Sequence, residues 1–273
     1  MDYKKLISYF KKPQPKKKSS TGNIRSFKAA FNNRFIDWIL TSSNKVNIDL
    51  ISQLKVLIER SRSLAQNNEI FRSYLSNCEK CIVGSEGFRL QMQIKNDDGT
   101  LNQELNDEIE WAWYEFTKKK NLELSETLGD IDFDTLLLRT LLVDGEAFIQ
   151  IIKDPKSPFG VRFKLIDTLS VDTNYIQIMT ETQNGIFNGV EVDHNYKPVR
   201  YWMRTCYNGN YESGKLYAVP ADQIIHLYRQ EFIDQVRGFS PIVASLDSLK
   251  QLDDFAVAEL IAAKVSSCQG IFY

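Results

Sequence analysis

The fold is decided by residues 219–264, which read VPADQIIHLYRQEFIDQVRGFSPIVASLDSLKQLDDFAVAELIAAK. The first part predicts a strand over residues 224–228, because five mostly apolar residues follow a turn-forming Pro-Ala-Asp. The second part predicts a helix, since Ser240 can cap it, Pro241 suits its first position and apolar residues recur at helical spacing beyond them. Ending near residue 268, this helix would be about 42 Å long. We expect a helix of that length to pack against other elements or other subunits.

Upstream of this stretch the pattern is mostly β. Short apolar segments predict strands at 147–152, 161–166, 189–192 and 199–203. The sequence Asp193-His194-Asn195-Tyr196 predicts a hairpin turn between the last two of these strands. Sequential strands joined by short turns favour antiparallel pairing.

The first half of the chain is mostly helical in pattern. Apolar residues at helical spacing predict helices at about 27–39, 47–66, 69–83, 102–120 and 133–143. Gly84 stands where a C-terminal cap is expected, and Asp144-Gly145 ends the last of these helices. Residues 88–94 alternate between apolar and polar side chains and predict a half-buried strand. The sequence therefore predicts an α+β fold of helices and mainly antiparallel strands.

Charge is distributed unevenly along the 273 residues, although the formal net charge is −1. The first 28 residues carry nine Lys or Arg and one acid, Asp2, so that this tail is strongly basic and the remainder is acidic. Residues 1–26 are predicted to form a basic disordered arm, which contacts a polyanion or is a solvated tail. The acidic remainder does not fit a sequence-specific DNA reader. No apolar run is long enough to span a membrane, and 43 % hydrophobic residues exclude bulk disorder.

The cysteines and histidines do not form a recognisable metal or redox site. Cys78 and Cys81 form one CxxC, but structural zinc needs four ligands, and Cys206 and Cys268 are not a second pair. We interpret Cys78 and Cys81 as small core-facing residues. His226 lies inside an apolar strand and is interpreted as a structural histidine with satisfied hydrogen bonds.

Carboxylates are the only candidates for catalysis. A metal-dependent nuclease could be assembled from the acids around the predicted helix at 133–143, namely Asp132, Asp134, Asp144 and Glu146. The structural interpretation is simpler: acids before a helix act as caps or dipole partners, and Asp144-Gly145-Glu146 is a helix-to-strand turn. The sequence contains no P-loop and no Gly-x-Gly-x-x-Gly. We therefore predict a protein without enzymatic activity, metal or cofactor, and keep the nuclease as an alternative.

The order of several motifs resembles the lambda-type family of tailed-bacteriophage portal proteins. The likeness is carried by the sequences of residues 60–68, 74–87, 111–116, 137–148, 189–193, 198–202, 219–228, 235–241 and 252–264. The segment from Val219 to Lys264 is the most specific, and Asp144-Gly145-Glu146 resembles a turn of the family. Asp167-Thr168 departs from the Asp-Pro that members often have. The likeness begins at about residue 27.

The resemblance implies an organisation in three parts. Residues 27–236 would form an α+β domain like the portal wing, and residues 237–273 would form a long stem-like helix and the start of a missing C-terminal half. Portals of this family are about twice this length. The residues that the resemblance places at subunit contacts or at the channel are Arg237, Gly238, Pro241, Asp253, Asp254, Glu259 and Lys264. Gly238 could instead belong to a turn, where it would adopt a positive φ.

The resemblance also implies a mechanical function. Portal subunits form a ring of about twelve copies at one capsid vertex, closed by rotation. Double-stranded DNA passes through the ring, and the large terminase subunit, the capsid and head-completion proteins bind it. The protein would be assembled in the bacterial cytoplasm and end up in the virion. The basic arm would contact DNA or scaffold through Lys11, Lys12, Lys16, Lys17 and Lys18. A non-functional, truncated prophage remnant is the other alternative.

Overall fold

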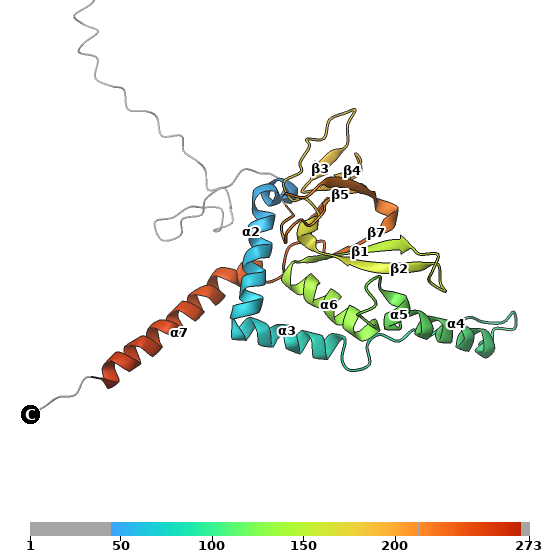
Figure 1. Cartoon of the computed structure of the whole chain (residues 1–273), viewed down its shortest axis with the longest axis horizontal. Coiled ribbons are helices and arrows are strands. Elements are labelled where there is room, and N and C mark those ends of the chain that lie inside the picture. Colours follow the sequence, from blue (N-terminus) through green and yellow to red (C-terminus); the bar gives the residue numbers. More distant parts are fainter. Residues whose placement is uncertain (1–44, 212, 269–273) are drawn as a thin grey trace, which may run out of the picture. The chain divides into compact units, whose positions relative to one another are not determined.

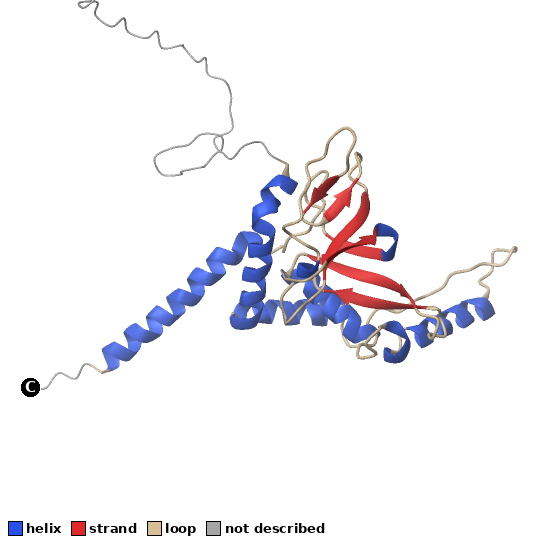
Figure 2. Cartoon of the chain, turned by 45° about the horizontal axis from the view of Figure 1, so that its top comes forward, coloured by secondary structure: helices blue, strands red, loops and turns tan. Residues whose placement is uncertain are grey.

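The computed structural model describes residues 45–211 and 213–268 (Figure 1). These described residues belong to one compact unit. Three expectations lie outside the described residues: the basic arm at 1–26, the helix at 27–39, and the arm's lysines Lys11, Lys12, Lys16, Lys17 and Lys18. Within the described residues, helices and antiparallel strands are both present, so the α+β prediction is confirmed (Figure 2).

Two helices open the described chain, and a single residue joins them. Asn68 separates α2 (Val46–Asn67) from α3 (Glu69–Ile82). Its backbone is extended, which ends α2, and its side chain accepts a hydrogen bond from the Phe71 amide at 2.9 Å, which caps α3. The buried faces carry apolar residues at helical spacing: Leu50, Leu54, Ile58, Phe71 and Leu75. Both predicted helices are therefore confirmed.

Three further helices precede the first strand. They are α4 (Gln103–Phe116), the single turn α5 (Lys119–Leu122) and α6 (Asp130–Val143). α6 ends at the predicted Asp144-Gly145, where Gly145 has φ +90° and sends the chain directly into β1 (Glu146–Lys153). α6 and β1 are thus fixed relative to each other by one tight turn.

The strands form two antiparallel sheets. β1 is the central strand of the first, between β2 (Val161–Ile166) and β7 (Ile224–Tyr228). The second sheet contains four strands in sequence order: β3 (Gly185–Phe187), β4 (Val190–Val192), β5 (Pro198–Arg204) and β6 (Leu216–Pro220). The predicted hairpin turn at 193–196 joins β4 to β5. β7 follows β6 almost at once, so the chain crosses from one sheet to the other there.

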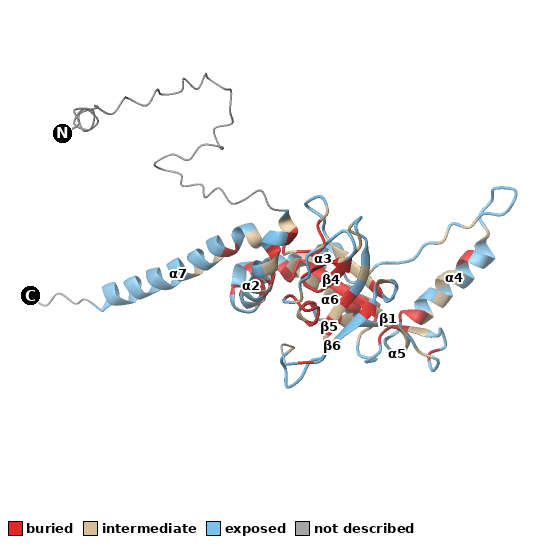
Figure 3. Ribbon diagram, turned by 90° about the horizontal axis from the view of Figure 1, so that it is seen from above, coloured by how far each residue is buried: buried red, intermediate tan, exposed pale blue. Residues whose placement is uncertain are grey.

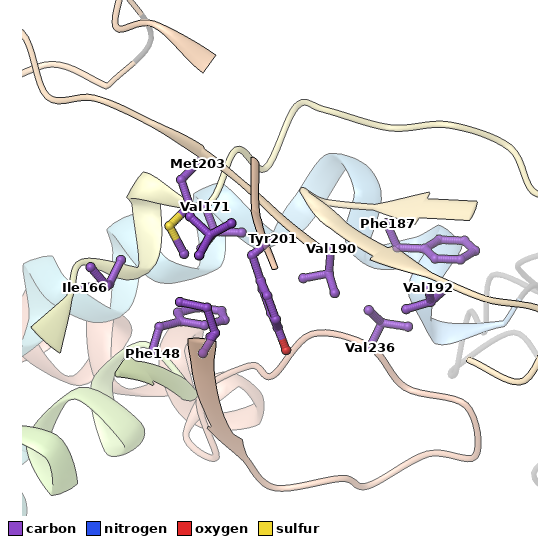
Figure 4. Packing of buried hydrophobic residues seen from close by; sticks show 11 residues of the cluster. Phe148, Ile166, Val171, Phe187, Val190, Val192, Tyr201, Met203 and Val236 are labelled. Carbon is purple, nitrogen blue, oxygen red and sulfur yellow. The ribbon is translucent and has the colours of Figure 1, made fainter. Parts of the chain in front are cut away.

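The first sheet is covered on both faces because its side chains alternate. Phe148 of β1 points to the second sheet, where it lies edge-on to Tyr201 with ring centroids 5.8 Å apart (Figure 4). Ile149, the next residue, packs with Phe133 of α6 on the opposite face. The second sheet contributes Val190, Val192, Tyr201 and Met203 to the shared core. The described chain therefore has helices, one sheet and a second sheet as successive layers.

The strand predicted at residues 88–94 is wrong. The segment is extended, but its amides bond to side chains of α4: the Met92 amide donates to Glu110 at 2.7 Å and the Ile94 amide to Asn106 at 2.9 Å. An alternating pattern indicates one buried side, but here only Met92 and Ile94 are half-buried, and Phe88 and Leu90 are exposed.

Three other details differ from expectation. The short strands β3 and β6 were not predicted. The last helix, α7 (Leu246–Ser267), begins five residues after Pro241, because Ser240 does not cap it and donates its hydroxyl to the Leu142 carbonyl at 2.7 Å. Cys81 is exposed and Cys78 half-buried, so neither is a core residue.

Candidate assembly site: helix α7 and its root

The segment that leads into α7, residues 235–245, is called here the root. Its central feature is a buried charge pair between Arg237, which is 1 % exposed, and Glu146, which is fully buried at the start of β1. The Arg237 Nε atom donates to Glu146 Oε2 at 3.0 Å, and Nη2 donates to Oε1 at 2.6 Å. A bidentate, charge-assisted pair of this kind fixes both distance and orientation. The root is therefore tied to the central strand of the first sheet.

Two further groups form hydrogen bonds with the Glu146 carboxylate. The Gly238 amide donates to Oε2 at 2.9 Å, and His226 Nε2 lies 3.0 Å from the same oxygen. Burial alone would raise the pKa of Glu146, but the Arg237 charge and the hydrogen bond with His226 lower it to about 2. The carboxylate thus stays ionised in the interior.

His226 is the neutral member of this network. Burial lowers its pKa, although the hydrogen bond with Glu146 opposes that shift. A neutral ring can donate from Nε2 to Glu146 and accept at Nδ1 from the Tyr201 hydroxyl, which lies 3.3 Å away. The interpretation of His226 as a satisfied structural histidine is confirmed.

Two glycines allow the root to reach this carboxylate. A Cβ on Gly238 would lie 2.4 Å from the Gly145 carbonyl oxygen and 2.8 Å from the Glu146 Cβ. A Cβ on Gly145 would lie 1.9 Å from the carbonyl carbon of Phe239. Gly238 does not have the positive φ that we considered, so its role is close approach of two backbones and not a left-handed turn.

α2 also contacts the turn at residues 144–146, through Arg62. Arg62 donates from Nε and Nη2 to the two oxygens of Asp144 at 2.8 and 2.6 Å, and from Nη2 to Asp167 at 2.8 Å. Asp144 is 3 % exposed, whereas 31 % of the Arg62 side chain is exposed, so this pair is buried on the side of the carboxylate only. The predicted helix-to-strand turn at 144–146 is confirmed, and its two acids hold two different arginines.

The first turns of α7 continue the anchored region. Leu246 is buried against Leu64, Phe71 and Val143, which come from α2, α3 and α6. Ile242, Val243 and Leu249 pack against the same cluster. The root and the first turn of α7 are therefore part of the chain's own core.

Beyond Lys250 the character of α7 changes abruptly. Every residue from 251 to 268 is exposed except Asp253, which is half-buried (Figure 3). The exposed residues include large apolar ones at 48–61 % exposure: Leu252, Phe255, Val257, Leu260, Ile261 and Val265. Between residues 255 and 263 only Glu259 is charged, so apolar side chains surround the helix. A helix that is apolar on all sides is normally buried.

The residues that sequence reasoning singled out are divided between these two regions. Arg237 and Gly238 lie inside the fold, and Pro241 is exposed in the root. Asp253, Asp254, Glu259 and Lys264 lie along the exposed part of α7, where Asp254 pairs with Lys250 at 2.6 Å. The partnership of Glu146 with Arg237 was missed. The sequence contains one signal of this pairing: the acidic Glu146 and the basic Arg237 each stand next to a glycine, in Gly145-Glu146 and Arg237-Gly238.

The alternative nuclease site is not assembled. Asp144 and Glu146 hold arginines, and Asp132 pairs with Lys119 at 3.0 Å. Burial and the neighbouring Asp130 raise the pKa of Asp134. Among the described residues no group of three or more His, Cys, Asp or Glu side chains is placed to hold a metal ion. In the same part of the chain, no helix combines the length and the apolar composition needed to cross a membrane.

Comparison with known proteins gives the arrangement its context. The family model described as phage portal protein, lambda family, matches residues 31–273. A probable portal protein of Halomonas phage phiHAP-1 is 25 % identical over 266 residues, which cover 95 % of this chain and 51 % of that protein. The chain thus spans about half the length of the curated relative that it matches. The family match includes α2 to α7 with the buried root, and the chain belongs to the lambda family of phage portal proteins.

Proposed function

We propose that this chain supplies the wing and the start of the stem of a portal ring. Residues 27–236 would form the wing-like domain and residues 237–273 the beginning of the stem. The ring, of about twelve copies related by rotation, would stand at a capsid vertex of the virion after assembly in the host cytoplasm. DNA would pass through it, and the large terminase subunit and head-completion proteins would bind it. Membership in a structural family supports a mechanical and non-enzymatic role.

One observation carries the proposal: α7 is anchored at its root and exposes apolar side chains beyond it. Six large apolar residues of α7 are 48–61 % exposed to water. Removing apolar surface from water stabilises a protein by about 25 cal/mol per Å², so covering these residues is favourable. A monomer cannot cover them with the described residues. Because the apolar residues surround the helix, contacts on two sides are favoured, as in a ring where each copy lies between two neighbours.

The charges on α7 support a channel role. Asp253, Asp254 and Glu259 outnumber Lys264 on the exposed part of the helix. Acidic side chains repel the phosphate backbone, which keeps DNA from sticking as it slides. Within this proposal, Arg237 and Gly238, which are buried, position α7, and Pro241, which is exposed in the root, contacts a neighbouring subunit. The lysines of the arm, Lys11 to Lys18, would contact DNA or scaffold.

The test is the assembly state of the chain with and without the apolar surface of α7. We expect native mass spectrometry and negative-stain microscopy to show higher oligomers for the chain and monomers for Leu260→Asp and Ile261→Asp. Ile178→Asp is the matched control, because Ile178 is 82 % exposed outside α7. A chain that is monomeric at all concentrations would contradict the proposal and favour the prophage-remnant alternative.

A further inference from the structure

α4 carries an exposed stripe that contains two aromatic residues and one acidic residue. Asp107, Trp111 and Tyr114 follow one another at spacings of four and three residues, so they lie on the same side of the helix. Trp111 is 64 % exposed and Tyr114 is 61 % exposed. We call Asp107, Trp111 and Tyr114 the α4 stripe. Tryptophan is usually well buried, so a tryptophan exposed to this degree indicates a surface that contacts something else.

The other side of α4 makes the contacts that hold the helix in place. Asn106 and Glu110 bond to the backbone amides of Ile94 and Met92. Phe116 is buried and lies edge-on to Phe163, with centroids 5.6 Å apart. The α4 stripe can therefore change without loss of the contacts that fix α4.

The charges on α4 itself all have one sign. α4 contains no basic residue, and it contains five acidic ones: Glu104, Asp107, Glu108, Glu110 and Glu115. Such a helix repels phosphate groups and attracts cations. A nucleic-acid partner is thus disfavoured, and a cationic one is favoured.

The chain itself shows how a cation binds here. The ammonium of Lys118 lies 4.7 Å from the centroid of the Tyr114 ring and donates a hydrogen bond to Glu115. The hydrogen bond to Glu115 raises the pKa of Lys118, which means that this environment favours the charged ammonium. Trp111, one turn earlier, provides a larger aromatic face beside Asp107 with no lysine on it that the structure describes. Tryptophan is the best aromatic partner for a cation.

We propose that the α4 stripe is a docking site for a lysine- or arginine-rich segment of a partner protein. A basic side chain of the segment lies over Trp111 and pairs with Asp107, in the way that Lys118 uses Tyr114 and Glu115. The neighbouring acids Glu104 and Glu108 attract the remaining charges of the segment. This inference is independent of α7 and of ring formation.

The test is a binding titration of the 273-residue chain with a fluorescently labelled octalysine peptide. We expect a binding isotherm by fluorescence anisotropy that weakens with added salt, because exposed charge pairs are screened. Trp111→Ala should weaken binding about threefold, the size of an exposed cation–π contact. Asp107→Lys should weaken it by at least as much.

Matched controls separate the α4 stripe from the general acidity of the chain. Tyr207 is also 64 % exposed, and Glu181 is an exposed acid on another loop. Tyr207→Ala and Glu181→Lys should bind the peptide as the unaltered chain does. Equal losses in Trp111→Ala and Tyr207→Ala would overturn the proposal. Binding that appears only after deletion of residues 1–28 would also overturn it, since the occupant would then be the chain's own lysine-rich segment.

Discussion

Gly145 and Gly238 cross so closely that neither position has space for a Cβ: the one added to Gly238 would lie 2.4 Å from the Gly145 carbonyl oxygen. The two residues are far apart in the sequence and belong to the two motifs Asp144-Gly145-Glu146 and Arg237-Gly238. Their crossing brings Arg237 onto Glu146, and it places the root of α7 on the first strand of the sheet.

Alanine at Gly145 should be strongly destabilising. The substitution forces a residue with a Cβ to adopt a positive φ, and it places a methyl group against the Phe239 backbone. We therefore expect the free energy of unfolding to fall by about 3 kcal/mol or more. Urea denaturation followed by tryptophan fluorescence measures it. Gly160→Ala is the control, because Gly160 has φ +69° with no atom near its Cβ position. It should cost only about 1 kcal/mol. Equal losses in the two variants would show that the crossing is not tight.

Removing one charge of the buried Glu146–Arg237 pair should lower the free energy of unfolding more than removing both charges. Glu146→Gln leaves the Arg237 guanidinium without a counter-charge in the interior, and we expect about 3–5 kcal/mol of destabilisation. Arg237→Met should cost a similar amount. The double variant should be less destabilised than either single variant, since neither charge is then left alone. Additive losses in a double-mutant cycle would contradict a direct pairing of these side chains.

The network predicts two steps in the dependence of stability on pH. His226 has a lowered pKa in the folded state, so the unfolded chain binds an extra proton below about pH 6.5, and stability falls as the pH drops from there. Glu146, with its pKa lowered to about 2, adds a second loss below about pH 4.3.

His226→Gln should remove the first step and leave the second. The chain has only one other histidine, His194, which is exposed and serves as the control. His194→Gln should keep both steps in urea titrations between pH 2 and 8. A step near pH 6.5 that persists in His226→Gln would show that another group causes it.

Asp144 should matter for stability and not for catalysis. Asp144→Ala leaves Arg62 without its bidentate partner, so we expect about 2 kcal/mol or more of destabilisation. We expect no cleavage of plasmid DNA by the chain with Mg²⁺ or Mn²⁺, at any concentration used for the stability measurements. Turnover that Asp144→Ala abolishes would instead establish the nuclease alternative.

Much of the fold follows from local sequence. The strands at 161–166 and 224–228 were predicted to the residue, because each is a short apolar run bounded by turn residues. Residues 88–94 were misassigned because alternation reports one buried side and does not report whether a sheet or a helix covers it. β3 has only three residues, and β6 exposes Tyr217 and Ala218, so neither gives a periodic signal.

The candidate site was only partly predictable. The apolar composition of α7 and its need for partners follow from the sequence, since periodicity and composition are local properties. The pairing of Glu146 with Arg237 depends on the contact of the start of β1 with the root, which are 91 residues apart in the sequence. No pattern within either motif gives that contact. Only a three-dimensional structure supplies it.

The anchoring of α7 at one end makes the helix a lever. Its 22 residues extend about 33 Å from the root, so a change of about 5° at the root moves the far end by about 3 Å. A shift of that size is comparable to the width of a methyl group and would misalign apolar packing at the tip. The buried contacts around Glu146 therefore determine where the far end of α7 lies. A small change in these contacts causes a displacement that grows with distance along the helix.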